Sequence, residues 1–387
     1  MRKSHYGILL AGFYGVLISG FILNFFARLS VPKFKNAEAG AQSWGKQAIS
    51  FLSQYPRQFD DWYSEDFPFR SELIHVDNRL RYQVLRSSTT GNVVFGKNGH
   101  LFFAGQQNVE IYRNLMPFSD QQVAADIGRL EERAARLAAL GIKYVLIVAP
   151  DPHTIYPEDL PDWIKPVSKK SRLDQFLEKA RSCKHLILVD LRPALIRAKS
   201  RGRLYHLTDT HWNALGAFIA CEDIMRAVDS GKNGAVGLRI PHLDLDRDYI
   251  VSRRWLRGGD LANMLGLADE MREEEIEVTK KNVSHAQVVG EGDPMHAQLR
   301  KRIQDSGGFT AEQSHEFDTI NPDVDPSRRV LVFRDSFFSY MTSYISEEFY
   351  AAHYVWSNGT YGQGYVDNFK PTVVIQEVVE RSLNCDL

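Results

Sequence analysis

Two short segments of this chain combine the residue types used in nucleophilic catalysis. The first is Asp209-Thr210-His211-Trp212, in which a carboxylate stands two residues before a histidine. In a turn, such a carboxylate can bind one ring nitrogen of the histidine, fix its tautomer and leave the other nitrogen free to act as a base. The structural alternative is that Asp209 caps the helix that follows while His211 packs against the core.

The second segment is Arg334-Asp335-Ser336, which joins an apolar run at residues 330–333 to a helix-like stretch. A serine in a strand-to-helix turn presents its hydroxyl at the carboxyl edge of a sheet, where α/β proteins bind ligands. The backbone N–H groups of the turn can then stabilise an oxyanion. Here the structural alternative is that Ser336 is only the N-cap of the helix.

Together the two segments supply a nucleophile, a base and an acid that orients the base. We therefore predict a catalytic triad of Ser336, His211 and Asp209, whose order along the chain is free to vary. A metal site of His206, Asp209 and His211 is the other arrangement, but no further acid or cysteine stands nearby in the sequence to complete it. We expect a site that uses no metal and no cofactor.

Four other polar residues are candidates for the oxyanion site or the pocket. Asn358 lies in a Ser-Asn-Gly turn, where its amide either donates to an oxyanion or only forms the turn. Glu377 and Arg381 stand four residues apart and either line the pocket or form an exposed pair. Arg334 is a pocket candidate because it precedes the serine turn. The acidic run at residues 273–275 is expected to be a solvated face.

The elements that must position these residues alternate between helices and apolar strands. An Asn-Gly turn between apolar runs at 93–95 and 101–103 predicts a β-hairpin. Beyond it, the alternation is typical of an α/β fold with a parallel sheet covered by helices on both faces. The predicted helices span 119–140, 173–182, 192–200 and 212–228, and the predicted strands span 142–149, 186–189, 330–333, 352–356 and 372–376.

The alternation is interrupted between about residues 229 and 328, where glycine, charge and short β-like pieces such as 286–289 replace it. We expect an irregular insertion within a catalytic domain at 59–387. Helical spacing with aromatic residues at 59–85 predicts a helical lead-in to this domain, and the polar residues at 31–58 are expected to form a stalk.

The amino-terminal segment predicts a membrane anchor within residues 1–30. The twenty residues from Gly7 to Phe26 carry no charge. A helix of twenty residues is long enough to cross about 30 Å of hydrocarbon. The alternatives are a cleaved signal peptide, whose apolar region is usually only about 7–15 residues long, and a buried core helix. Basic residues flank the segment on both sides and do not decide its orientation.

The composition excludes some classes of partner and of protein. Its 387 residues include 47 Lys and Arg against 48 Asp and Glu, so no basic excess indicates a nucleic-acid partner. Hydrophobic residues make up 44%, which excludes a disordered protein. The three cysteines, Cys183, Cys221 and Cys385, fit neither a zinc-site spacing nor a CxxC redox motif.

Five motifs in the same order resemble the SGNH-hydrolase-like domain of alginate O-acetyltransferases. The resemblance covers about residues 60 to 383 and rests on the hairpin at 96–102, Thr154 to Pro161, Asp209-Thr210-His211-Trp212, Gly259-Asp260-Leu261-Ala262 with Met264-Leu265-Gly266, and Asp335-Ser336-Phe337, followed by 371–381. The chain departs from the family at three places. His100 replaces a tryptophan, His153 replaces a lysine, and Arg334 replaces the glycine of a strict Gly-Asp-Ser motif.

The resemblance implies a circularly permuted, flavodoxin-like SGNH fold and the triad Asp209, His211 and Ser336. It also implies a single-pass inner-membrane protein with a periplasmic catalytic domain, which acetylates hydroxyls of an exported polysaccharide. Because acetyl-CoA is cytoplasmic and no nucleotide-phosphate loop is visible, the resemblance implies a membrane-bound O-acyltransferase partner that delivers acetyl groups across the membrane. Two other functions remain open: a polysaccharide acetylesterase with the same triad, and a non-catalytic polysaccharide-binding scaffold of an export complex.

Overall fold

The computed structural model describes residues 70–85, 87–88, 90–230, 240, 242–289 and 316–383, together with Gly15. The chain separates into two units, residues 1–80 and 81–387. The described part of the first unit contains the helix α3 (Arg70–Leu80), within the predicted lead-in. The predicted anchor (apart from Gly15) and the stalk lie outside the described residues. Within the described ranges, no helix has the length and apolar character needed to span a bilayer.

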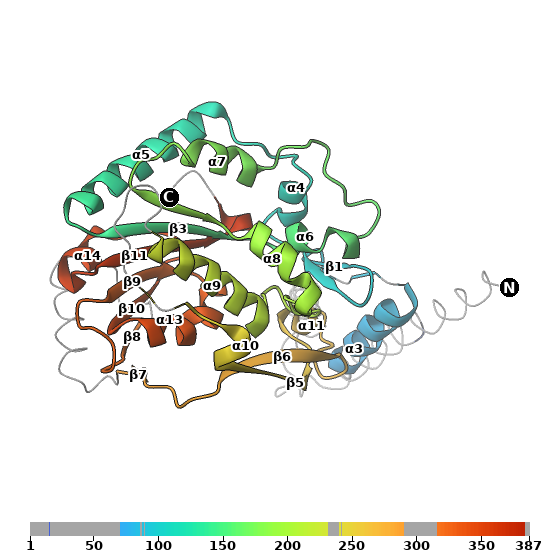
Figure 1. The fold of residues 1–387 in the computed structure, drawn as a ribbon. Coiled ribbons are helices and arrows are strands. Elements are labelled where there is room, and N and C mark those ends of the chain that lie inside the picture. Colours follow the sequence, from blue (N-terminus) through green and yellow to red (C-terminus); the bar gives the residue numbers. More distant parts are fainter. Residues whose placement is uncertain are drawn as a thin grey trace, which may run out of the picture. The chain divides into compact units, whose positions relative to one another are not determined.

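The second unit is built on a seven-stranded sheet (Figure 1). Its strands, in spatial order, are β4 (Leu186–Asp190), β3 (Lys143–Ala149), β11 (Val373–Val379), β9 (Arg329–Arg334), β10 (Ala351–Trp356), β8 (Phe317–Ile320) and β7 (Gln287–Val288). The first five strands run parallel, whereas β8 and β7 pair antiparallel at one edge. The prediction of a wholly parallel sheet was therefore wrong at that edge, because β7 and β8 come from the segment expected to be irregular.

Helices cover both faces of the sheet, as predicted. In β3, Tyr144 and Leu146 belong to one hydrophobic core, whereas Val145 and Ile147 belong to the other. Successive side chains of a strand point to opposite faces, so a strand buried on both faces is continuously apolar in sequence. One face packs on α5 (Asp120–Ala139), α7 (Arg172–Ala180) and α14 (Gln363–Phe369), and the other on α8 (Arg192–Ala198), α9 (Ala214–Asp229) and α13 (Thr342–Glu348) (Figure 1).

The helix ends follow local capping chemistry. Helix α5 begins after Ser119, which forms a capping box with Gln122, and Gly141, with a φ of 74°, follows its end. These bounds agree with the helix predicted at 119–140. Helix α9 begins two residues later than predicted. Asn213 is its N-cap, with an extended backbone and a side chain that accepts from Gly216 N–H. His211 therefore lies in the turn before the helix.

Two small antiparallel sheets lie outside the central sheet. The predicted hairpin is present as β1 (Val93–Phe95) and β2 (Leu101–Phe103). The segment expected to be irregular contains a second pair, β5 (Tyr249–Arg257) and β6 (Arg272–Lys280), joined through α11 (Asp260–Met264). The remaining short elements are η2 (Arg81–Leu85), α4 (Asn108–Tyr112), α6 (Pro152–Ile155), η3 (Pro157–Asp159), η4 (Lys199–Arg201), α10 (Leu245–Asp248), η6 (Phe337–Met341) and η7 (Glu380–Ser382).

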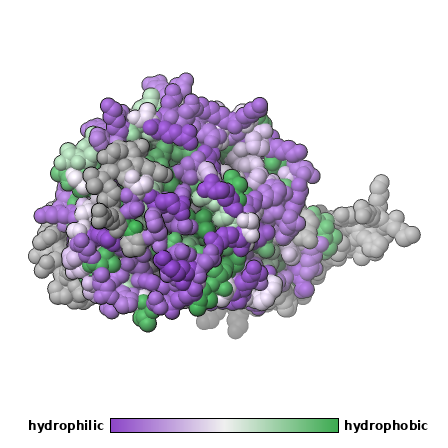
Figure 2. All heavy atoms as spheres, viewed as in Figure 1, coloured by the Kyte–Doolittle hydropathy of each residue, from purple (hydrophilic) through white to green (hydrophobic). Residues whose placement is uncertain are grey.

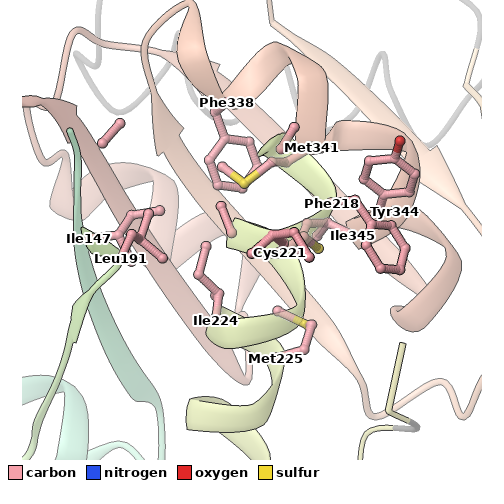
Figure 3. Packing of buried hydrophobic residues seen from close by; sticks show 14 of the residues in the cluster. Ile147, Leu191, Phe218, Cys221, Ile224, Met225, Phe338, Met341, Tyr344 and Ile345 are labelled. Carbon is pink, nitrogen blue, oxygen red and sulfur yellow. The ribbon is translucent and has the colours of Figure 1, made fainter. Parts of the chain in front are cut away.

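The core beneath the functional residues joins α9 to η6 and α13. Figure 3 shows side chains from these elements packed together, with Phe218, Cys221, Ile224 and Met225 from α9 and Phe338, Met341, Tyr344 and Ile345 from η6 and α13. Because α9 follows His211 and η6 follows Ser336, this packing fixes the two segments relative to each other. Cys221 is a free thiol in this core, and burial raises its pKa well above the usual value.

The apolar residues are mainly inside. The face seen in Figure 2 is largely hydrophilic, with hydrophobic residues in small groups between polar ones. Scattered apolar groups of this kind are ordinary on a protein surface.

Candidate active site

His211 forms hydrogen bonds on both sides of its ring. Its Nδ1 lies 2.7 Å from Asp209 Oδ1, and its Nε2 lies 2.8 Å from Ser336 Oγ. Because an ionised carboxylate only accepts hydrogen bonds, Nδ1 carries the proton and Nε2 accepts from the Ser336 hydroxyl. The side chains of His211 and Asp209 are 17% and 18% exposed, so the site is partly shielded but reachable from solvent. The hydrogen-bonded arrangement is the one predicted from the sequence.

Ser336 lies just beyond β9, and its side chain forms no cap bond to the helix that follows. The residue before it, Asp335, caps the turn instead. Asp335 Oδ1 accepts from Phe337 N–H at 2.8 Å, and its Oδ2 accepts from Val379 N–H at 2.8 Å. Asp335 therefore holds the turn to β11 and leaves the Ser336 hydroxyl free for His211.

Trp212 joins the histidine segment to the serine segment. Its indole Nε1–H donates to Phe337 O at 2.9 Å, and its ring meets the Phe337 ring edge-on at 5.2 Å. The Trp212 side chain is fully buried. The Phe337 ring also lies 4.8 Å from the His211 ring. These contacts, with the core of Figure 3, position the imidazole over the serine.

Asp209 is held in its ionised form. Its Oδ1 also accepts from His211 N–H at 3.0 Å, and its Oδ2 accepts from Asp260 N–H at 3.0 Å. Burial opposes ionisation of Asp209, but the hydrogen bond and charge of His211 outweigh it and lower the pKa of Asp209 to about 2. At neutral pH the carboxylate can therefore stabilise an imidazolium at His211.

The acidic run at 273–275 was predicted as a solvated face, which was wrong for two of its residues. Glu273 and Glu275 are 4% and 9% exposed. Alternation along β6 turns both inward, where the Glu273 carboxylate accepts from Leu207 N–H and from the Thr208 hydroxyl. Glu273 thus anchors the residues immediately before Asp209.

Gly259 allows a close approach to Asp209. A Cβ atom at this position would lie 2.5 Å from both Cβ and Oδ2 of Asp209. The Gly259 N–H donates to Thr208 Oγ1 at 2.9 Å, so the backbone is held at this distance. Only glycine fits here without displacing the carboxylate.

The Ser336 N–H is available as an oxyanion donor. Among the described residues none accepts a hydrogen bond from it, whereas the next N–H, that of Phe337, is used by Asp335. An oxyanion formed on an acyl group at Ser336 Oγ would lie close to this donor.

Glu377 and Arg381 do not form the exposed pair considered from the sequence. Glu377 is fully buried in β11 and accepts from Asp335 N–H at 2.8 Å. Burial and the charge of Asp335 raise the pKa of Glu377 well above its usual value. Arg381 instead pairs with Asp151 at 2.5 Å. Glu377 therefore supports the serine turn from β11, whereas Arg381 ties η7 to Asp151 after β3.

The other two pocket candidates also have structural places. Asn358 is exposed, with a φ of 49°, and forms the turn after β10. Arg334 is buried; its Nη1 donates to Ser339 Oγ at 2.9 Å and its guanidinium lies 4.9 Å from the Trp356 ring centre.

The metal combination considered from the sequence is not the one that assembles. In the part of the chain that the structure describes, the potential ligand atoms within 4.8 Å of one another belong to Asp209, His211 and Asp260. His206 instead lies 3.9 Å from Glu273. Both ring nitrogens of His211 are engaged by Asp209 and Ser336, an arrangement suited to proton transfer.

A cavity of about 570 Å³ opens at the same carboxyl edge of the sheet. Its walls include Thr154 after β3, Arg192 after β4 and Glu380 after β11, but not Ser336 or His211. Burial and the charge of Asp151 raise the pKa of Glu380 to about 7.

Comparison with known proteins identifies the family. The family model described as "SGNH hydrolase-like domain, acetyltransferase AlgX" matches residues 93–296, more than half of the chain. The chain belongs to this family. The matched range of the AlgX-type domain contains Asp209 and His211, and Ser336 lies beyond it.

Relatives of this SGNH hydrolase-like domain include proteins named probable alginate O-acetylase AlgJ. The protein from Pseudomonas aeruginosa is 30% identical over 189 residues, which cover 49% of this chain and 44% of the relative. The one from Pseudomonas fluorescens is 27% identical over 187 residues, covering 48% and 45%. The match thus spans less than half of each relative. Bacillus cereus PatB1 has the same fold, with a TM-score of 0.51 and 13% identity over 75% of this chain and 96% of PatB1.

Two of the departures from the AlgX-type pattern are buried histidines. His100 Nδ1 lies 3.1 Å from Asp159 Oδ2, and both His100 and His153 are fully buried. Burial lowers the pKa of His100 below its usual value and that of His153 to about 4. Both histidines therefore fill the core as neutral rings beside Phe102.

Proposed function

We propose that this chain is an O-acetyltransferase that adds acetyl groups to hydroxyls of an exported polysaccharide through an acetyl-Ser336 intermediate. The observation that carries the proposal is the continuous hydrogen-bonded series from Asp209 through His211 to Ser336, in a domain of the AlgX-type family. The relatives named as alginate O-acetylases support an acidic polysaccharide as the acceptor.

The geometry supports a two-step transfer. His211 Nε2 takes the Ser336 proton as Oγ attacks the acetyl carbonyl, and the Ser336 N–H stabilises the oxyanion. The intermediate collapses, and His211 gives the proton to the leaving group of the donor. An acceptor hydroxyl then loses its proton to His211, attacks the acetyl-serine and carries the acetyl group away, while the same proton returns to Ser336 Oγ. Asp209 stabilises the imidazolium in both steps.

The location and the acetyl donor belong to the same proposal. The uncharged run from Gly7 to Phe26 supports a single-pass anchor, and the resemblance to alginate O-acetyltransferases favours a periplasmic catalytic domain. A domain outside the cytoplasm has no direct access to acetyl-CoA, which favours a membrane-bound O-acyltransferase partner that delivers the acetyl groups. The order Asp209, His211, Ser336 along the chain favours a circularly permuted SGNH arrangement.

A reporter fusion tests the location. A phosphatase reporter that requires export, fused after Ser53, should be active. Activity of a cytoplasm-only reporter at the same position would show that the topology is the opposite one.

One assay separates the transferase from the alternatives. The purified full-length chain is supplied with an activated acetyl ester, with and without acidic oligosaccharides. Acetylated oligosaccharide as the main product supports the transferase. Free acetate at the same rate with and without acceptor indicates an acetylesterase. No turnover of the ester, together with oligosaccharide binding, indicates a non-catalytic scaffold.

A further inference from the structure

Asp260 is a second carboxylate at the catalytic histidine that the triad does not include. It is the first residue of α11, in the inserted segment. Its Oδ1 accepts from Thr210 N–H at 2.8 Å, and its Oδ2 accepts from the Thr210 hydroxyl at 2.6 Å. Its Oδ2 lies 4.0 Å from His211 Nδ1. The Asp260 side chain thus bonds Thr210, the residue between Asp209 and His211, and places a carboxylate oxygen beside the imidazole.

The same residue also acts on Asp209 through its backbone. The Asp260 N–H donates to Asp209 Oδ2, while Asp209 Oδ1 faces His211 Nδ1. Asp260 thus holds Thr210 with its side chain and Asp209 with its backbone. Asp209 cannot also accept the bonds from Thr210, because both of its carboxylate oxygens already accept other hydrogen bonds.

The charged and titratable groups around His211 come from several elements. Asp209 and Asp260 lie on the side of Nδ1, Ser336 lies at Nε2, and the Tyr340 ring of η6 lies 5.9 Å from the imidazole. Farther out, the His206 ring lies 5.9 Å from the Tyr340 ring, and Glu273 lies 3.9 Å from His206. The Arg381 guanidinium lies 5.4 Å from the Phe337 ring. Asp260 and Asp209 are the two carboxylates within 4.0 Å of His211 Nδ1 in the described part of the chain.

We infer that Asp260 is a positioning residue for the catalytic base: it holds the 209–211 turn through Thr210 and supplies a second negative charge that stabilises the protonated form of His211. Its consequence for acetyl transfer rests on the proposed function, because an imidazolium forms in each step of that scheme. The electrostatic part acts only when Asp260 is ionised. Burial and the charge of Asp209 raise the pKa of Asp260, so it ionises at higher pH than Asp209.

A direct test measures the titration of His211 in the full-length chain with ¹⁵N-labelled histidine rings. The His211 signals are assigned by their loss in His211→Gln. In Asp260→Asn the midpoint of the His211 titration should fall by about one pH unit, because an opposite charge close to the ring is lost. Asp269→Asn is the matched control. Asp269 belongs to the same segment, its side chain is 89% exposed and its partner is Arg257, so the midpoint should stay at the wild-type value.

Two further variants keep the test decisive. Asp260→Ser removes the charge but keeps a small hydroxyl acceptor, and it replaces Asp260→Asn should that chain fail to fold. Thr210→Val keeps the Asp260 charge but removes the Thr210 hydroxyl, which bonds Asp260 and also lies 3.2 Å from His211 Nδ1. Amide exchange in the 209–211 turn should become faster, and the midpoint should fall by less than in Asp260→Asn. An unchanged His211 midpoint in a folded, neutral Asp260 variant would overturn the inference.

The pH dependence of acetylation by an activated ester separates this inference from the proposed function. If both are correct, the acidic limb of the rate profile shifts downward in Asp260→Asn by the same amount as the His211 titration. If the wild-type chain forms no acetyl-serine but the titration shifts, the proposed function fails and the role of Asp260 at His211 stands.

Discussion

Two regions of the molecule meet at His211, and they differ in how regular they are. The carboxyl edge of the parallel strands presents Ser336 directly after β9, in a turn stabilised by Asp335 and by β11. The inserted segment from β5 to β6 instead approaches the 207–211 turn from the side and holds it through Gly259, Asp260 and Glu273. The regular region thus presents the nucleophile, whereas the inserted region orients the base.

Substitutions in the two regions should therefore lower the acetylation rate for different reasons. Loss of a group at the sheet edge removes a reacting atom. Loss of a group in the inserted segment leaves all reacting atoms in place but displaces them, and a misplacement of about 1 Å can lower a rate about a hundredfold. Substitutions in the two regions therefore test the comparison directly.

The largest effect is expected at the sheet edge. Ser336→Ala should lower acetyl transfer by three or more orders of magnitude, on the order of the loss seen when a triad nucleophile is removed. Because the Ser336 side chain forms no cap bond, the free energy of unfolding should change by less than about 0.5 kcal/mol. His211→Ala should be equally inactive, and the double variant should be no worse than either single one. Strictly additive losses would show that the two residues do not act as a unit.

The next effect is expected in the inserted segment. Gly259→Ala places a Cβ 2.5 Å from the Asp209 side chain, so it should lower the acetylation rate about a hundredfold and destabilise the chain by about 1–3 kcal/mol. Gly128→Ala is the matched control. Gly128 lies within α5 with open space around it, and this change should stabilise the fold by about 0.5–1 kcal/mol. A Gly259→Ala enzyme with full activity would show that the close approach does not position Asp209.

A smaller effect distinguishes neighbouring residues of the acidic run. Glu273→Ala leaves Leu207 N–H and the Thr208 hydroxyl without their buried acceptor, and should lower the free energy of unfolding by about 1–3 kcal/mol. Glu274→Ala removes only an exposed pair with Arg253 and should change it by less than about 1 kcal/mol. Denaturant unfolding of both variants measures the difference. Equal losses would contradict the inward orientation of Glu273.

The last effect appears only as the pH changes and concerns Glu380 at the sheet edge. The pKa of Glu380 is raised to about 7, so its neutral form is favoured in the folded state. Its contribution to stability is full below its unfolded pKa of about 4.3 and is lost as the pH rises through about 7. Between pH 5 and pH 8, wild-type stability should therefore fall by roughly 1–3 kcal/mol more than that of Glu380→Gln, measured by denaturant unfolding. Parallel pH profiles for the two chains would contradict the raised pKa.

The sequence carried most of the information about the sheet edge. Continuous apolar runs located five buried strands, and the motifs around His211 and Ser336 were enough to predict their hydrogen-bonded arrangement. Sequence could not show that Asp335, and not Ser336, caps the turn. Both residue types are good N-caps, so only the bonds to Phe337 and Val379 distinguish them.

The inserted segment was harder to predict for a physical reason. Strand β5 is exposed along most of its length, so its sequence lacks the apolar alternation that marks a buried strand. Glu273 and Glu275 are inward-facing because β6 alternates, but a run of glutamates is usually solvated. Gly259 was an available signal, since glycine is used where the backbone approaches another group closely.

The central claim is that Ser336 is the nucleophile activated by His211 and Asp209. Mass spectrometry of the full-length chain after brief exposure to an activated acetyl ester tests it most directly. The account predicts one added acetyl group, on the peptide that contains Ser336, formed in the wild-type chain and absent in Ser336→Ala and His211→Ala. An acetyl group on another residue, or an equal amount on Ser336 when His211 is replaced, would contradict it.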